Sequence, residues 1–103
     1  VGQAGRSYLI LDSGENRIRK FEGPVVPDMT IAEALYSSSV NGHFDFRYFI
    51  DKNGFLKVEK IGDAINLKDG PNWHFYLNDL SINSNMIGSI KLKKGDKIDV
   101  KYK

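Results

Sequence analysis

Thr30-Ile31-Ala32-Glu33-Ala34-Leu35 is the stretch that decides the fold, because it is the one clear helix start in the chain. Glu33 follows Thr30 at the spacing of a capping box, in which two side chains satisfy free amide groups at a helix N-terminus. Ile31, Ala34, Leu35 and Ser38 then recur at helical spacing, which predicts one narrow buried stripe along the helix. Asn41-Gly42 is a typical helix stop. These features predict one helix over residues 31–40.

On the N-terminal side of this helix the pattern is that of a β-hairpin. Residues 7–11 are rich in strand formers, residues 12–16 are turn formers, and residues 17–21 resume the strand pattern. Leu9 and Leu11 share one face of the first strand, and Tyr8 and Ile10 share the other. Because both faces are apolar, we expect this strand to lie inside a sheet.

On the C-terminal side the chain has several more strand patterns. Residues 46–50 and 55–61 flank an Asn53-Gly54 turn, residues 66–72 form a polar loop, and short strands are expected at 73–78, 89–92 and 97–103. Alternation in the 73–78 and 97–103 strands predicts four buried side chains, those of Trp73, Phe75, Ile98 and Val100.

A hairpin, one helix and a run of strands predict an α+β fold that is β-grasp-like, a mixed sheet with one principal helix. The 103 residues suit one domain. We expect that domain to span residues 7–103. The chain begins at Val1 rather than at Met, so residues 1–6 are interpreted as a tail or the remnant of a cut.

Composition narrows the classes of function. The chain has no cysteine, which excludes disulfides and cysteine metal sites. Its net charge of +2 is too small to indicate nucleic-acid binding, and it has no apolar run of transmembrane length. The six lysines from Lys91 onward outweigh Asp96 and Asp99, for a local charge of +4. We interpret these lysines as the protection of an edge strand, with a weak anionic contact as the alternative.

The motifs of catalysis and metal binding do not match. With Gly54 in the sixth position of an EF-hand loop, the first and twelfth positions are Phe49 and Lys60, which cannot serve as calcium ligands. His43 and His74 each lack a second histidine within four residues. Motifs of nucleophilic catalysis and phosphate binding are absent from the sequence. We therefore expect neither an enzyme nor a metal site, and no cofactor.

Aromatic residues gather in two places, residues 44–49 and residues 73–76. Stacking on nucleic-acid bases is one possible role for such clusters, but here the basic residues are not interleaved with the rings. Packing in the core accounts for most of these aromatics. Tyr48, His74 and Tyr76 are the members expected at the surface.

Three stretches together suggest a family. Residues 30–35 resemble the threonine-led helix of transcobalamin-like C-terminal domains. Residues 73–78 (Trp-His-Phe-Tyr-Leu-Asn) resemble the strand and turn Trp-x-Tyr-x-Asn-Gly of that family, and residues 93–102 resemble its closing Gly-Asp strand. The matches occur in the family's order and span nearly the whole chain. Asp79 departs from the pattern, since the family usually has Gly there.

The resemblance implies a β-grasp fold and a bacterial, Gram-positive setting at the cell surface or outside the cell, with neighbouring domains of a larger parent protein as partners. It also implies two functions. The first expectation is a non-catalytic surface or secreted module for structural spacing or protein interaction. The alternative is a domain that binds a small, corrinoid-like ligand, with cobalamin as the obvious compound to try. That site would use Trp73, His74, Tyr76 and Asn78.

A third reading is a ubiquitin-like carrier, which shares the fold. Such a carrier needs a C-terminal Gly-Gly, and this chain ends in Lys101-Tyr102-Lys103. We therefore set this reading aside unless the true C-terminus lies further on.

Overall fold

The computed structural model describes residues 5–67 and 69–103. In this part of the chain there is one α-helix, α1 (Ile31–Gly42), and a short 3-10 helix, η1 (Ser84–Met86). The strands are β1 (Arg6–Asp12), β2 (Ile18–Pro24), β3 (Phe46–Ile50), β4 (Leu56–Ile61), β5 (Ala64–Ile65), β6 (Trp73–Leu77), β7 (Leu80–Ile82) and β8 (Lys97–Tyr102).

Five strands form a mixed sheet in the order β2-β1-β8-β6-β7. The first and last strands of the chain, β1 and β8, run parallel in its middle, with Leu9 beside Ile98 and Leu11 beside Val100. The other neighbours are antiparallel. This arrangement confirms the predicted α+β, β-grasp-like class, and β1 lies inside the sheet as its two apolar faces predict.

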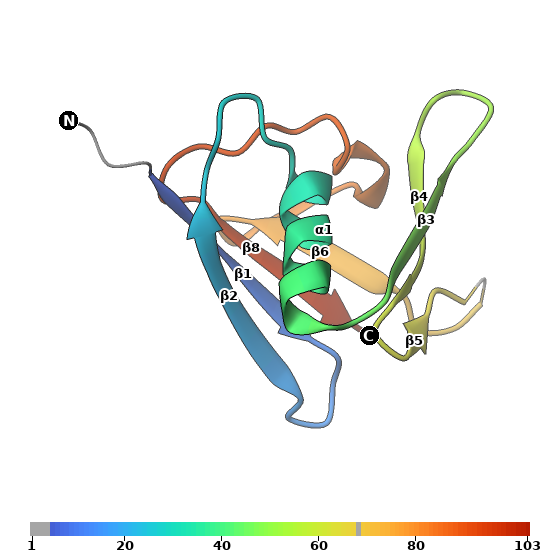
Figure 1. Ribbon diagram of the computed structural model, residues 1–103. Coiled ribbons are helices and arrows are strands. Elements are labelled where there is room, and N and C mark those ends of the chain that lie inside the picture. Colours follow the sequence, from blue (N-terminus) through green and yellow to red (C-terminus); the bar gives the residue numbers. More distant parts are fainter. Residues whose placement is uncertain (1–4, 68) are drawn as a thin grey trace.

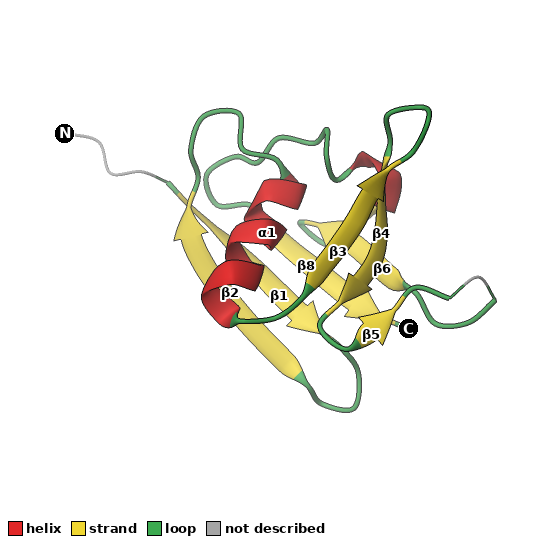
Figure 2. Cartoon of the chain, turned by 45° about the vertical axis from the view of Figure 1, so that its right-hand side comes forward, coloured by secondary structure: helices red, strands yellow, loops and turns green. Residues whose placement is uncertain are grey.

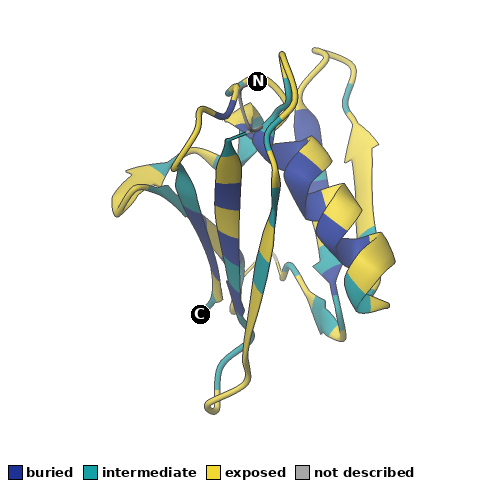
Figure 3. Ribbon diagram, turned by 60° about the vertical axis from the view of Figure 1, so that its left-hand side comes forward, coloured by how far each residue is buried: buried dark blue, intermediate teal, exposed yellow. Residues whose placement is uncertain are grey.

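Helix α1 lies across one face of this sheet, as Figures 1 and 3 show. Its stripe of Ile31, Leu35 and their neighbours is buried against the sheet, where Phe75 is also fully enclosed. The four side chains predicted from alternation, Trp73, Phe75, Ile98 and Val100, are all buried. The opposite face of the sheet, here called the outer face, bears exposed side chains such as Tyr8 and His74.

Both ends of α1 follow from local chemistry. The capping box is present: Thr30 accepts a hydrogen bond from the Glu33 amide, and the Glu33 carboxylate accepts one from the Thr30 amide. The helix ends two residues later than predicted. His43, with φ of 55°, is its left-handed C-cap. Gly42 is needed for a close approach, since a Cβ there would lie 2.7 Å from the Phe21 ring.

A second, three-stranded sheet in the order β3-β4-β5 stands beside the first (Figure 2). The sequence pattern does not separate these strands from the main sheet, because strand formers reveal pairing only where a turn joins the partners. The β3–β4 hairpin is joined by the predicted turn, in which Asp51 Oδ1 accepts hydrogen bonds from the amides of Asn53 and Phe55. A β-bulge lies between Arg47 and Tyr48.

Two predictions about the C-terminal third are wrong. Residues 89–92 do not form a strand; apart from one bridge between Thr30 and Lys91, the segment consists of turn and loop. Its apolar residues are explained by packing, because Leu92 is buried and Ile90 packs against the core. Strand β8 is not an edge strand, since it pairs with both β1 and β6. Its lysines therefore do not protect a sheet edge.

The predicted tail of residues 1–6 falls partly on residues 1–4, which lie outside the described residues. Arg6 is already the first residue of β1, and the Gly5 carbonyl accepts a hydrogen bond from the Val25 amide at 2.7 Å. Among the described residues there is no helix with both the length and the apolar character needed to cross a membrane.

Candidate functional site

Strand β6 carries three of the four predicted site residues and divides them between the two faces of the sheet. Successive side chains of a strand point to opposite sides. Trp73 is buried on the face that carries α1, whereas His74 is exposed on the outer face and Tyr76 is half-buried there. The structure therefore does not bring Trp73 together with His74 and Tyr76 on one surface.

His74 and Tyr76 are covered in part by the end of β8. His74 Nε2 lies 3.1 Å from the carbonyl oxygen of Lys103. The ammonium nitrogens of Lys101 and Lys103 lie 5.3 and 5.5 Å from the centre of the Tyr76 ring. These are cation–π distances, so a ligand stacked on Tyr76 would first have to displace the two lysine side chains.

Asn78 has a structural role at the turn between β6 and β7, where its φ is 50°. Its Nδ2 donates to Asp96 Oδ1 at 2.9 Å, and its Oδ1 accepts from the Lys97 amide at 2.9 Å. Both ends of the side-chain amide are therefore engaged in holding this turn against the start of β8. Asp79, which replaces the family's usual Gly, adopts a φ of 72°.

Lys97 and Asp79 form the closest ion pair at this end of the sheet, with Lys97 Nζ 2.8 Å from Asp79 Oδ1. The hydrogen bond from Lys97 lowers the pKa of the Asp79 carboxyl below its ordinary value. The same hydrogen bond to Asp79, followed by the charge of Asp99, raises the pKa of the Lys97 ammonium. These shifts reflect an exposed surface pair and do not mark a reactive group.

Trp73 leads to a different surface. Its ring packs against Tyr102, with ring centres 5.0 Å apart, at the bottom of a hollow of about 890 Å³ between the β1–β2 turn and β5. We call this cavity the β5 hollow. It is lined by Leu11, residues 13–19, Ile61, Asp63, Ala64, Ile65, Leu67, Pro71, Trp73, Tyr102 and Lys103. A second hollow, between β2 and α1, measures about 400 Å³.

The two aromatic residues also fix the wall of the β5 hollow. Trp73 Nε1 donates a hydrogen bond to the Ala64 carbonyl at 2.9 Å, and the Tyr102 hydroxyl donates to the Ile65 carbonyl at 2.9 Å. The amide of Trp73 donates to Asn66 Oδ1 at 2.6 Å. The short strand β5 is thus held by side chains of the main sheet as well as by its pairing with β4.

The β5 hollow has three apolar side chains open to solvent, beside the polar and charged residues of the β1–β2 turn, Asp63 and Lys103. Ile18 and Ile65 are each 53% exposed and Leu67 is 48% exposed. Of the cations at the hollow, Arg17 pairs with Glu15, and Arg19 donates to the Gly42 carbonyl while lying over the rings of Phe21 and Phe44. Aromatic and apolar side chains beside a few polar groups are the usual composition of a small-molecule site.

Sequence reasoning missed the β5 hollow apart from Trp73. A strand of two residues carries no periodic signal, and the pairing of Trp73 with Tyr102 depends on the order of strands in the sheet. The alternation in residues 73–78 predicts that Trp73 is buried. A buried indole N–H needs a hydrogen-bond acceptor, which indicates that another segment packs against Trp73.

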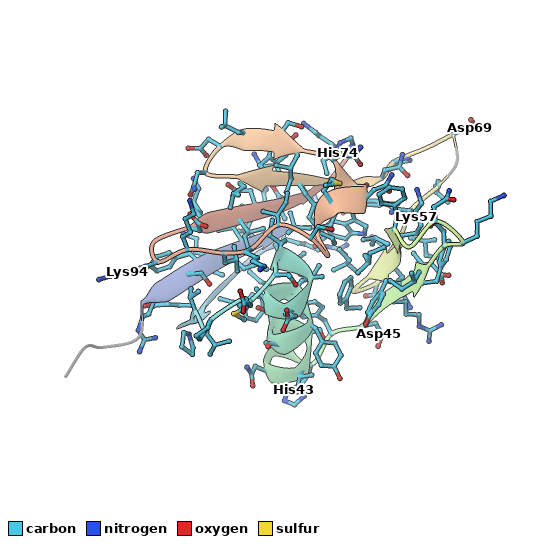
Figure 4. The ribbon with its side chains drawn as sticks, turned by 90° about the horizontal axis from the view of Figure 1, so that it is seen from above. His43, Asp45, Lys57, Asp69, His74 and Lys94 are labelled. Atoms are coloured by element: carbon cyan, nitrogen blue, oxygen red, sulfur yellow. The ribbon has the colours of Figure 1, made fainter. Side chains whose placement is uncertain are left out.

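The histidines do not form a metal site. His43 caps α1 and His74 lies on the outer face, and Figure 4 shows the two on opposite sides of the molecule. Across residues 5–67 and 69–103, no three His, Asp or Glu side chains are grouped so that they could hold a metal ion.

Comparison with solved structures places this geometry among known folds. A putative metal-binding protein from Ruminococcus gnavus ATCC 29149 superposes with a TM-score of 0.73 at 13% identity, over 96% of each chain. Haptocorrin, in a crystal structure of its complex with Cbi, superposes with a TM-score of 0.75 at 11% identity. That match covers 100% of this chain and 26% of the haptocorrin chain.

The predicted transcobalamin-like resemblance is confirmed at the level of the fold. The whole chain corresponds to about a quarter of haptocorrin, so in that protein the fold is one part of a larger chain. No family model matches the sequence, and no curated protein matches it.

Proposed function

We propose that this chain is a non-catalytic ligand-binding domain of a larger protein, and that it holds one side of a flat molecule of the corrinoid-like class in the β5 hollow. The observation that carries the proposal is the β5 hollow itself, which is lined by the rings of Trp73 and Tyr102 and by three exposed apolar side chains, Ile18, Ile65 and Leu67. Exposed apolar side chains around a concave surface are typical of binding sites.

The size and openness of the β5 hollow fit a ligand that a second domain covers from above. Ligand sites usually measure about 300–1,000 Å³, and the β5 hollow measures about 890 Å³. The likeness in fold to haptocorrin, solved as a complex with Cbi, supports the choice of ligand class. A ligand held from one side gains roughly half of its contacts but loses its full rotational and translational freedom, so isolated binding is weak.

Calorimetric titration with cobinamide tests the proposal. We expect binding no tighter than about 100 μM, which corresponds to about −5.5 kcal/mol. Ile65→Lys places a charge among the exposed apolar side chains of the β5 hollow and should abolish measurable binding. Val40→Lys is the matched control, since Val40 is 56% exposed on α1 and lies outside the β5 hollow. It should leave the affinity unchanged.

Two results would contradict the proposal. A sub-micromolar dissociation constant that disappears on His74→Ala would place a corrinoid on the outer face instead. Absence of binding at millimolar cobinamide would favour the second function, a module for structural spacing or protein interaction at the bacterial surface.

The observation in favour of that second function is the β3–β4 hairpin, which stands out from the body of the molecule in Figure 1. It bears four exposed apolar side chains, Tyr48, Phe49, Ile50 and Phe55. Apolar groups at such a density on a projecting element are typical of a contact with another protein.

A further inference from the structure

Strand β3 is an edge strand whose protection is limited to one charge, Arg47, and to the β-bulge in its pairing with β4. Proteins protect sheet edges with charges, proline or short strands, because an open edge pairs with other chains. Edge strand β2 carries Arg19, Lys20 and Glu22 and ends at Pro24, while β5 and β7 have two and three residues. Strand β3 (Phe-Arg-Tyr-Phe-Ile) has five residues and one charge.

The hydrogen bonds of the hairpin show which groups of β3 face the open edge. The Asp51 amide donates to the Phe55 carbonyl at 2.9 Å, and Phe49 lies opposite Lys57 in the same register. In an antiparallel pair only every second residue bonds to its partner strand. The backbone groups of Tyr48 and Ile50, which lie between the bonded positions, therefore point away from β4.

These two residues are suited to pair with their own copies. When two β3 strands meet antiparallel about Phe49, Tyr48 of each lies opposite Ile50 of the other, and both have free backbone groups to exchange. Phe49 then lies opposite Phe49 in a non-bonded pair, where side chains approach most closely. All three side chains are about half exposed, at 45%, 48% and 57% for Tyr48, Phe49 and Ile50.

Charge supports the same register. One position further along, Arg47 of each copy approaches Asp51 of the other. Arg47 is exposed and forms no ion pair within the described residues. Asp51 is held in place by its hydrogen bonds in the turn, and its Oδ2 also lies 3.8 Å from Lys57 Nζ, so Arg47 of the second copy would share this carboxylate with Lys57. A two-fold symmetric contact requires a surface that complements itself, and residues 47–51 meet this condition.

There is also room beside β3. A hollow of about 360 Å³ separates β3 from α1 and is lined by Ala32, Glu33, Tyr36, Ser37 and Tyr48. In the symmetric pairing Ile50 of the second copy lies opposite Tyr48, which lines this hollow together with the exposed Tyr36 ring.

We propose that the chain forms a two-fold symmetric dimer by antiparallel pairing of β3 with β3 of a second copy, centred on Phe49. The contact is small compared with an obligate dimer interface. The association is therefore reversible, with a dissociation constant in the range of about 1 μM to about 1 mM. The dimer contact and the β5 hollow have no residue in common, so either proposal can fail without the other.

Sedimentation velocity of the whole chain from about 10 μM to about 1 mM tests the dimer. The wild-type chain should shift from monomer to dimer as concentration rises. Ile50→Lys should raise the dissociation constant at least about tenfold, and Val40→Lys, on an equally exposed side chain, should change it less than about twofold. Arg47→Glu, which places like charges opposite Asp51, should also weaken the dimer, and the weakening should be smaller in high salt.

Circular dichroism melts of each variant verify that it is folded. If Ile50→Lys unfolds the hairpin, the dissociation constant of the Arg47→Glu variant tests the dimer in its place. A chain that stays monomeric at about 1 mM would overturn the proposal. So would a dimer whose affinity is unchanged by both Ile50→Lys and Arg47→Glu, because the contact would then lie elsewhere on the molecule.

Discussion

At the scale of single residues, the most regular strands are the most informative part of the sequence. Alternation in β6 and β8 places Phe75, Ile98 and Val100 in the core, and each is 1% exposed or less. It also places His74 on the outer face. Such positions are predictable because burial on one side of a strand imposes a period of two that no other structure produces.

Phe75 should be the costliest of these residues to truncate. Phe75→Ala removes a fully buried ring and leaves a cavity, so we expect the free energy of unfolding to fall by about 3–5 kcal/mol. His74→Ala, one residue away but exposed, should change it by less than about 0.5 kcal/mol. Urea melts measure both values. A loss below about 1 kcal/mol for Phe75→Ala would show that the faces of β6 are assigned wrongly.

The ion pair of Lys97 with Asp79 has a consequence that depends on pH. Its hydrogen bond lowers the pKa of Asp79 below 3.8 in the folded state, so its contribution to stability is present above that value and is lost as pH falls through the lower folded pKa. The raised pKa of Lys97 acts at the alkaline end, where the contribution is lost above 10.5.

Carbon-detected NMR titration of the Asp79 carboxyl measures this effect. In the wild-type chain its pKa should lie below 3.8, and Lys97→Met should return it toward that value. An Asp79 pKa that does not respond to Lys97→Met would mean that the pair is not formed in solution.

At the scale of elements, α1 is the element whose start and end could be predicted most closely from the sequence. The capping box of Thr30 and Glu33 was recognisable from spacing alone and is formed. Thr30→Ala removes the hydroxyl that accepts from the Glu33 amide and should lower the free energy of unfolding by about 1 kcal/mol. Ser37→Ala, at an exposed position within α1, is the control and should have little effect. If the two substitutions have equal effects in urea melts, the Thr30 hydroxyl does not stabilise the N-terminus of α1.

Several other elements could not be predicted from the sequence. The strands β5 and β7 have two and three residues, too few for a periodic pattern. Residues 89–92 resemble a strand because they contain Ile90 and Leu92, although Leu92 is buried from a loop. The central place of β8 depends on its parallel pairing with β1, at the other end of the chain, which no local signal reveals.

At the scale of the whole molecule, part of the candidate site could be predicted and part could not. Trp73 was singled out and lies at the β5 hollow, but His74 and Tyr76 lie on the outer face and Asn78 is engaged in a turn. The other lining residues come from segments up to about ninety residues apart, from Leu11 to Lys103. A surface assembled in this way is a property of the fold and has no motif.

Metal dependence can be tested on the whole chain. The test is motivated by the protein of similar fold that is described as a putative metal-binding protein. The two histidines lie apart and the sequence has no cysteine, so we expect no metal requirement. Treatment with EDTA should shift the melting temperature by less than about 1 °C. A fall of several degrees that added zinc or calcium reverses would contradict this expectation.

The β5 hollow is the proposed ligand-binding surface, and binding there can be observed directly. The chain has one tryptophan, and its indole N–H lies at this hollow, bonded to the Ala64 carbonyl. We therefore propose to follow the ¹H–¹⁵N NMR spectrum during titration with cobinamide. We expect the Trp73 indole signal and the amides of Ile18, Ile65 and Leu67 to shift together, while the amides of β3 do not shift. Shifts confined to His74 and Tyr76, or no shifts at millimolar cobinamide, would contradict the proposal.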